Sequence, residues 1–314
     1  TLNLAGAGED GLNILVDGRF PVSVLDTLSD EIDQATGHVN LSAQMIGSLQ
    51  DPVITADLEL DQVGMSLSYV VQDLRQINGR ISLVQDRIRV DTITGLIGDG
   101  EFDITGTADM NRYQPEQFHL ELNTRNLYLD FPDLMEISIS SRLVLDGTLA
   151  GSMLNGEIIL LEGRYDKDFK LNLTQMTQKQ RTRAPRRQPP AIPFFDHMAL
   201  DIDIIRRAPF WIDNNIAWLS ISPDLTLHGT VYRPLISGRA RVDSGIIMFQ
   251  KKEFDVLKGI IDFVNPYAIE PVIDIVGETQ VRSWRIQLSL SGTPDNLNLQ
   301  LSSEIGRASC RERV

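Results

Sequence analysis

Apolar and polar residues alternate one by one through most of this chain, and this alternation constrains the fold more than any other feature. In ITADLELD (residues 54–61), every even-numbered residue is apolar and every odd-numbered one is polar. The same alternation recurs in FHLELN, HMALDIDI, RIQLSLSG and LNLQLS. Successive side chains of a β-strand point to opposite faces, so each segment predicts a half-buried strand with one apolar face.

Glycines separate the expected strands at nearly regular intervals. GTLAGSMLNGEIILLEGRY and GTVYRPLISGRARVDSGII carry glycine at the same three offsets, and looser copies begin at Gly47 and Gly292. A Gly-Thr-x-x-x-Pro segment such as Gly229 to Pro234 predicts the end of a strand followed by a turn that needs glycine's torsional freedom. The proline then occupies a position where strand pairing needs no backbone N–H donor. Such repeats predict consecutive antiparallel strands of about five or six residues. We therefore expect an all-β protein with an elongated, curled, largely antiparallel sheet that forms a groove-like solenoid.

One segment, PVSVLDTLSDEIDQATG, has helical spacing instead. Apolar residues recur at helical intervals between Val24 and Ile32. Pro21 suits a first turn and Gly37 suits a helix end. The sequence therefore predicts one short helix on the N-terminal side.

The segment from Gln175 to Pro193 contains five cations, four prolines and no acid. This composition predicts a mobile loop that interrupts the sheet. We expect a β-repeat region over residues 1–174, the basic loop over 175–193, and a C-terminal β-domain over 194–304 that continues the same sheet. Residues 305–314 break the alternation and resemble a translated sequencing adaptor, so we expect no function there.

Charge and composition narrow the class of partners. The 314 residues include 29 basic and 43 acidic side chains, for a net charge of −14, which argues against nucleic acid as a partner. Cys310 is the one cysteine, so no intrachain disulfide can form. No apolar run approaches the roughly 20 residues that span a bilayer, and the chain starts at Thr1. We expect a piece of a longer protein.

A specific pattern marks the C-terminal third of the chain. It consists of Phe254-x-Val256, then Gly259-x-Ile261-x-Phe263 and Asn265-Pro266, with Pro271 before Ile273 and Ile275. At these residues the sequence resembles the C-terminal domain of the TamB family, which belongs to the AsmA-like group of bacterial envelope proteins. The resemblance includes the turn from Gly229 to Gly238 and the segment VRSWRIQLSLSGTPDNLNLQLSSE, and it weakens toward the N-terminus.

The resemblance implies a periplasmic protein, anchored in the inner membrane of a Gram-negative bacterium, that crosses the periplasm as a folded-over β-sheet with an apolar interior. It implies transport of phospholipid toward the outer membrane. It also implies a TamA-type β-barrel partner and a role in outer-membrane protein assembly. It implies no enzymatic activity and no cofactor.

A lipid path needs a continuous apolar surface, because each exposed acyl methylene costs about 0.8 kcal/mol and a dozen cost roughly 10 kcal/mol. The candidate acyl-chain contacts are Leu200, Ile202, Ile204, Leu225, Leu227, Ile286, Leu288, Leu290, Leu297, Leu299 and Leu301. The candidate headgroup contacts are Arg181, Arg183, Arg186 and Arg187, unless the basic loop is a solubilising linker. From alternation alone, the same apolar residues would be the packed core of a sandwich or solenoid.

The residues alone are compatible with two other functions. The chain is a scaffold if a sheet edge pairs with a β-barrel partner by strand addition. It is a polysaccharide-cleaving enzyme if Asp201 and Asp203, two apart on one strand, act as paired carboxylates. Acids alternate on the polar faces throughout, which favours a solvated face for this pair.

Other chemistry-bearing residues give weaker signals. The four histidines show no metal-ligand spacing, and no nucleophile with a base can be assembled, so we expect neither a metal site nor an enzyme. Trp211, Trp218 and Trp284 are expected in the core or at the rim of a groove.

Overall fold

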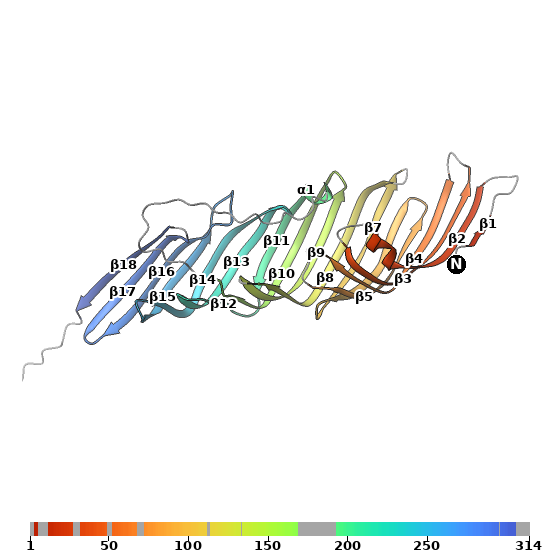
Figure 1. The fold of residues 1–314 in the computed structure, drawn as a ribbon. Helices are drawn as coiled ribbons and strands as arrows, with labels where there is room; N and C mark the ends of the chain where they lie inside the picture. The colour runs from red at the N-terminus through yellow and green to blue at the C-terminus, as the bar shows by residue number, and fades with distance from the viewer. Residues whose placement is uncertain are drawn as a thin grey trace, which may run out of the picture.

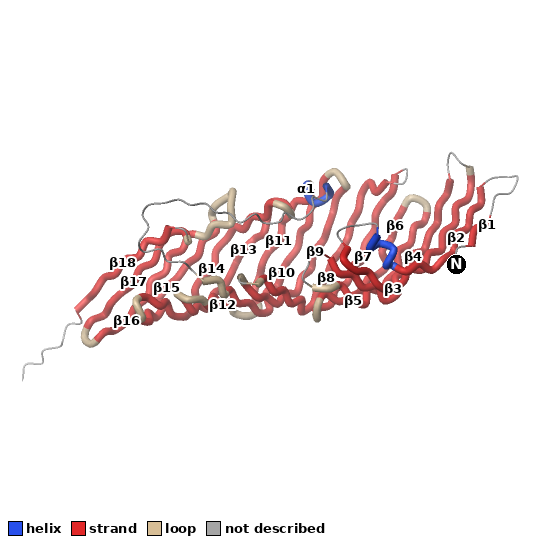
Figure 2. Tube along the Cα trace, in the orientation of Figure 1, coloured by secondary structure: helices blue, strands red, loops and turns tan. Residues whose placement is uncertain are grey.

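The structure is a computed structural model, and it describes residues 3–5, 12–27, 32–48, 52–67, 72–111, 114–132, 134–168, 193–294 and 296–305. These residues form one sheet of 18 strands that extends as a long, curled ribbon (Figures 1 and 2). The first ten strands are β1 (Asn3–Ala5), β2 (Leu12–Pro21), β3 (Ile32–Gly47), β4 (Pro52–Leu67), β5 (Leu74–Val84), β6 (Arg87–Ile97), β7 (Gly100–Asn111), β8 (Gln114–Phe131), β9 (Met135–Thr148) and β10 (Gly151–Tyr165). The others are β11 (Met198–Arg206), β12 (Phe210–Asp213), β13 (Ala217–Thr230), β14 (Arg233–Phe249), β15 (Lys252–Phe263), β16 (Val272–Val281), β17 (Trp284–Thr293) and β18 (Asn296–Ile305). Two short helices are described, η1 (Val22–Thr27) and α1 (Pro193–Asp196).

Strand order in the sheet follows the chain. Each strand pairs antiparallel with the next, except at β11 and β12, which both pair parallel with β10; the β10–β11 register starts at Ser152 opposite Met198. Strand β12 continues the row of β11, with Gly163 opposite Phe210, and β13 pairs antiparallel with both. The structure therefore confirms the predicted all-β, curled and largely antiparallel sheet.

The parallel step determines how the chain passes between the two halves of the sheet. Parallel neighbours start at the same edge, so Tyr165 at the end of β10 and Met198 at the start of β11 lie at opposite edges of the sheet. Residues 169–192, between these two strands in sequence, lie outside the described residues. They include most of the predicted basic loop and all four candidate headgroup arginines.

The predicted N-terminal-side helix is confirmed over Val22–Thr27 and is wrong for Pro21 and for residues 32–37, which lie in strands. The 3-10 helix η1 ends at Thr27, and β3 already begins at Ile32. Gly37 does not end a helix. It lies inside β3 with a φ of +90°, and a Cβ there would lie 2.7 Å from the Cα of Val63 in β4. Strand pairing with β2 and β4 along nearly all of β3 outweighs the local helical spacing.

The expected strand length of five or six residues is also wrong. Strands reach 18 residues in β8, which contains no glycine, and in other strands many glycines lie inside the strand instead of ending it. Gly238 and Gly245 both lie within β14, with φ values of +117° and +139°, opposite Leu225 and Leu219 of β13. At these positions glycine bends the strand, which then continues.

The Gly-Thr segments do form the predicted turns. Gly229 has a φ of +93°, and a Cβ on it would overlap the carbonyl oxygen of Arg233 across the β13–β14 hairpin. Thr230 Oγ1 accepts a hydrogen bond of 3.2 Å from the backbone N–H of Arg233. The segments starting at Gly147 and Gly292 form the same hairpin between β9 and β10 and between β17 and β18.

Candidate functional site

The register of the sheet gives each strand one apolar face and one polar face, because paired residues on neighbouring strands point to the same side. One apolar row runs from β4 to β11 through Leu58, Ile81, Val90, Gly106, Leu120, Leu145, Leu154 and Leu200. Another runs from β13 to β18 through Pro223, Ala240, Ile261, Ile273, Gly292 and Leu297. We name the surface made by these rows and their apolar neighbours the inner face, and the opposite surface the outer face.

The inner face is most deeply buried in the C-terminal strands. Leu288 in β17 has no exposed surface, and Leu219 in β13 and Ile275 in β16 are 2% and 3% exposed. They belong to a cluster of 11 buried residues drawn from β13 to β17. On β4 and β5, inner side chains such as Leu58 and Ile81 remain partly exposed. The inner face is therefore packed against itself at the C-terminal end and more open around Leu58 and Ile81, whereas Val63 in β4 is buried with Val22 of η1 and Ala35 of β3.

A buried hydroxyl pair lies on the inner face near the middle of the sheet. Thr124 in β8 and Ser141 in β9 are register partners and are 6% and 5% exposed. Their hydroxyl oxygens are 2.9 Å apart, so each hydroxyl has the other as a partner. A satisfied neutral pair of this kind leaves the apolar surface uncharged.

The outer face is polar and carries ion pairs between strands. Arg142 Nε donates to Glu157 Oε1 at 2.7 Å between β9 and β10. His119 in β8 lies 2.6 Å from Asp146 and 3.4 Å from Glu121, ring nitrogen to carboxylate oxygen. Hydrogen bonds to Asp146 and then to Glu121 raise the pKa of His119 above its ordinary value of 6.5. The side chains of His119, Glu121 and Asp146 are about half exposed, so these contacts contribute little to stability while they keep this side of the sheet in water.

The family model described as the TamB C-terminal domain matches residues 91–305, from within β6 to the last residue of β18. The chain belongs to the TamB family. A comparison with curated proteins finds no match. The resemblance inferred from the C-terminal pattern is thereby confirmed.

TamB membership points to a role in outer-membrane assembly or lipid transport, in a family of periplasm-spanning envelope proteins that are not known as enzymes. Among the residues that the structure describes, no helix is both long and apolar enough to cross a membrane. Within the same residues, no group of three or more histidine, cysteine, aspartate or glutamate side chains is placed to hold a metal ion.

The eleven candidate acyl-chain contacts of this TamB-family chain all lie on the inner face, but they differ in burial. The buried ones are Leu200, Ile202, Leu288 and Leu290, and the partly buried ones are Ile204, Leu225, Leu227, Ile286, Leu297 and Leu299. Leu301 in β18 is 51% exposed. Alternation places them on one face, whereas their burial depends on how far the sheet curls. Their contact with lipid stays a prediction.

The two acids considered for polysaccharide cleavage lie on the outer face of β11. Asp201 and Asp203 are both exposed, and the hydroxyl of Thr226 donates to Asp203 at 3.1 Å. Asp57 and Glu59 occupy the same kind of exposed outer position on β4. The pair thus shares the setting of the other outer acids in this TamB-family sheet.

Of the two positions expected for the tryptophans, the core or the rim of a groove, the structure excludes the core for Trp218 and Trp284. Trp218 and Trp284 are 47% and 43% exposed. Trp211 and Trp218 lie on the outer face, because the residues next to Trp211, Phe210 and Ile212, pack against the inner cluster. In the sequence FWID, Trp211 alternates with the apolar Phe210 and Ile212 and shares the side of Asp213, so the sequence already placed Trp211 on the polar face. Residue type alone does not give the side on which a tryptophan lies, whereas its position in the strand does.

Proposed function

We propose that this TamB-family chain carries phospholipid acyl chains along its inner face, by passive sliding, toward the outer membrane. In this proposal the chain is part of an inner-membrane-anchored protein that works with an outer-membrane β-barrel partner of the TamA type. The continuous apolar rows of the inner face are the observation that supports it. The arginines of the basic segment are the proposed contacts for anionic headgroups.

The energetics favour the inner face over the outer one. An acyl chain lying across the rows replaces water with Leu, Ile and Val side chains, which returns about 0.8 kcal/mol for each methylene covered. The outer face offers carboxylates and guanidinium groups at the same positions along each strand, such as Glu157 beside Ile158. A lipid tail placed there would desolvate charges, at a cost of several kcal/mol per unpaired ion.

The burial gradient sets a condition on this transport. Between β13 and β17 the inner face is filled by its own side chains, including Leu288 and Phe254, which are 0% and 4% exposed. An acyl chain that passes this section has to displace contacts between those side chains. We therefore expect lipid to be held more readily over β4 to β6 than over β13 to β17.

The experiment tests lipid contact at paired positions of one strand. Leu299 faces inward on β18 and is partly buried, and the adjacent Gln300 faces outward and is exposed. A photoreactive amino acid at position 299 is expected to cross-link to co-purifying phospholipid, and the same group at position 300 is not. Native mass spectrometry of the chain should show bound diacyl lipid in the wild type.

Charge variants extend the test to transfer. Leu299→Asp should reduce phospholipid transfer between vesicles, and Gln300→Asp, which adds the same charge to the outer face, should not. Fully buried positions such as Leu288 are less suitable, because a buried carboxylate there would also unfold the sheet. Absence of bound lipid in the wild type, or equal transfer by both variants, would overturn the proposal.

A second function rests on the edge of the sheet. Among the described strands, β18 pairs with β17 alone, so one side of it presents backbone N–H and C=O groups to a further strand. We propose, as the alternative, a scaffold that adds this edge to a strand of the barrel partner. Proline introduced into β18 should then abolish partner binding while phospholipid transfer persists, and loss of transfer with retained binding would reject it.

A further inference from the structure

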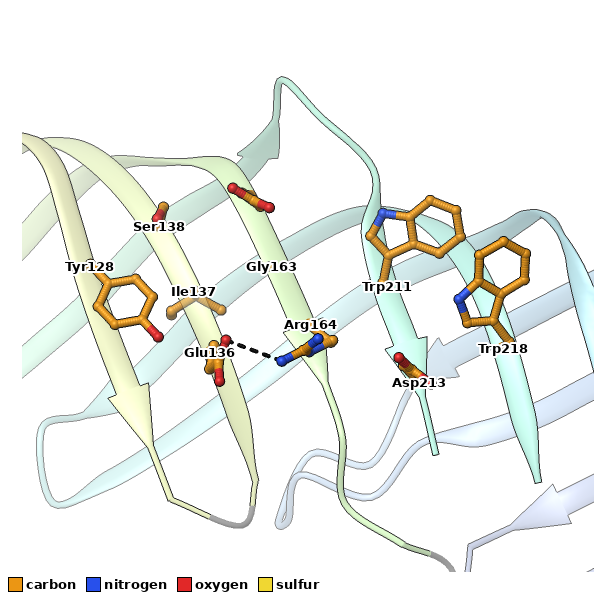
Figure 3. Close-up of a pocket in the computed structure, with 10 residues that line it drawn as sticks. Tyr128, Glu136, Ile137, Ser138, Gly163, Arg164, Trp211, Asp213 and Trp218 are labelled. Carbon is orange, nitrogen blue, oxygen red and sulfur yellow. Dashed lines mark hydrogen bonds and ion pairs between the residues drawn. The ribbon is translucent and has the colours of Figure 1, made fainter. Parts of the chain in front are cut away.

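An aromatic pocket lies on the outer face, across β8, β9, β10, β12 and β13, and the lipid path proposed above does not use it. Its volume is about 450 Å³. Tyr128 and Trp211 lie on opposite sides of Arg164 in this pocket (Figure 3). Because these side chains are on the polar side of the sheet, the pocket is separate from the inner face.

Two tryptophans form a flat apolar platform at one end of the pocket. The rings of Trp211 in β12 and Trp218 in β13 are stacked, with centroids 4.8 Å apart and an interplanar angle of 22°. Trp218 remains 47% exposed, so the stack leaves much of an indole in contact with water. A large exposed aromatic surface beside polar groups is typical of a ligand site.

Polar groups with spare hydrogen-bonding capacity surround the platform. Arg164 lies beside Trp211 in the parallel register and forms an ion pair of 3.4 Å with Glu136. Glu162 and Asp213 also line the pocket and are exposed, and neither carboxylate has a hydrogen bond or ion pair with another described residue. Three carboxylates against one guanidinium give the pocket a net negative charge.

We propose that this pocket binds a neutral or amine-bearing oligosaccharide. One face of a pyranose ring presents C–H groups, which stack on an indole, while its equatorial hydroxyls point outward. Those hydroxyls donate to the carboxylates of Glu162 and Asp213 and accept from Arg164. The pocket therefore offers an apolar platform and hydrogen-bonding partners to the same ring.

The geometry distinguishes this ligand from two others. A quaternary ammonium ion is held by aromatic faces on several sides, whereas these two indoles are nearly parallel and cover each other's inner faces. An anionic polysaccharide would meet the net negative charge of the lining carboxylates. A sugar with an amino group satisfies the platform and the charge together.

The test is isothermal titration of the 314-residue chain with three tetrasaccharides. The probes are the N-acetylglucosamine tetramer (neutral), the glucosamine tetramer (amine-bearing) and a sulfated heparin tetrasaccharide. We expect saturable binding of the first two, tighter for the amine-bearing tetramer, and none for the sulfated probe. Trp218→Ala should weaken binding about tenfold or more, in line with the loss of one aromatic stacking contact.

Two further variants keep the test independent of folding. Trp284→Ala removes an equally exposed tryptophan from the distant strand β17 and should leave binding unchanged. Glu162→Gln with Asp213→Asn alters only exposed carboxylates and should remove the preference for the amine-bearing tetramer. The proposal is overturned if neither tetramer saturates, if Trp284→Ala weakens binding as much as Trp218→Ala, or if choline binds at the platform and the tetramers do not.

Discussion

Truncation of Leu288 tests whether the C-terminal inner face is a packed core and whether the sheet is stabilised locally. Leu288 in β17 and Leu301 in β18 are register partners on the inner face. Their exposures are 0% and 51%. The substitutions Leu288→Ala and Leu301→Ala remove the same atoms from neighbouring positions, so the difference between them reports burial alone.

Because Leu288 is buried and Leu301 is half exposed, the two alanine substitutions are expected to reduce stability by different amounts. A fully buried leucine in a packed cluster loses its transfer free energy and leaves a cavity, for about 3 kcal/mol. A half-exposed leucine leaves no enclosed cavity and loses roughly 1 kcal/mol of transfer free energy. The difference of about 2 kcal/mol corresponds to roughly a 30-fold difference in the local opening equilibrium.

Hydrogen–deuterium exchange measured by mass spectrometry reports both the size and the place of the loss. Each strand contacts mainly its direct neighbours, so the sheet is expected to open locally instead of all at once. Leu288→Ala should lower protection in peptides from β13 to β17 by about 100-fold and leave β4 to β6 unchanged. Leu301→Ala should have a much smaller effect in the same peptides.

Two outcomes would refute this reasoning. Equal losses for the two variants would mean that Leu288 is not held in a packed cluster. Uniform loss of protection from β3 to β18 after Leu288→Ala would mean that the sheet unfolds as one cooperative unit, and that the local account of its stability is wrong.

Three smaller predictions follow from single features of the sheet. Gly245→Ala should destabilise the chain by about 2 kcal/mol or more in thermal denaturation, because φ is +139° and the new Cβ overlaps a carbonyl oxygen. Gly151→Ala, with no atom within 4 Å of the new Cβ, should be nearly neutral, and equal effects would contradict this account. Thr124→Val should cost about 1–3 kcal/mol in urea unfolding by leaving the hydroxyl of Ser141 unpaired, and adding Ser141→Ala should recover most of that loss. Because the pKa of His119 is raised in the fold, its stabilising contribution is complete below about pH 6.5 and is lost as the pH rises through the higher folded value; an NMR titration midpoint at or below 6.5 would contradict this.

The sequence predicted the class of fold because alternation is a local property. Each strand carries its own two-residue period, so the side on which Leu200 or Leu299 lies follows without knowledge of any partner strand. The Gly-Thr turns were predictable for the same reason, since the glycine at position 229 and the threonine after it act within one hairpin.

Features that depend on distant residues could not be predicted in this way. The segment before Gly37 has helical spacing throughout, but its last part, from Ile32, pairs with β4 and belongs to a strand. The length of a strand depends on whether the chain continues through a glycine or forms a hairpin turn next to it. Gly245 lies inside β14, whereas Gly229 lies next to the hairpin turn between β13 and β14. The basic, proline-rich composition predicted an interruption of the sheet after Tyr165, but no local pattern showed that β11 would pair parallel to β10.

The bends inside single strands have a consequence for the size of the molecule. Because glycines such as Gly238 and Gly245 set the curvature within one strand, adding a hairpin leaves the cross-section as it was. Each further hairpin lengthens the molecule by about 10 Å, and the 18 strands, two of which share a row, reach on the order of 80 Å. Duplication or loss of hairpins alone can therefore match such a protein to the width of the compartment it crosses.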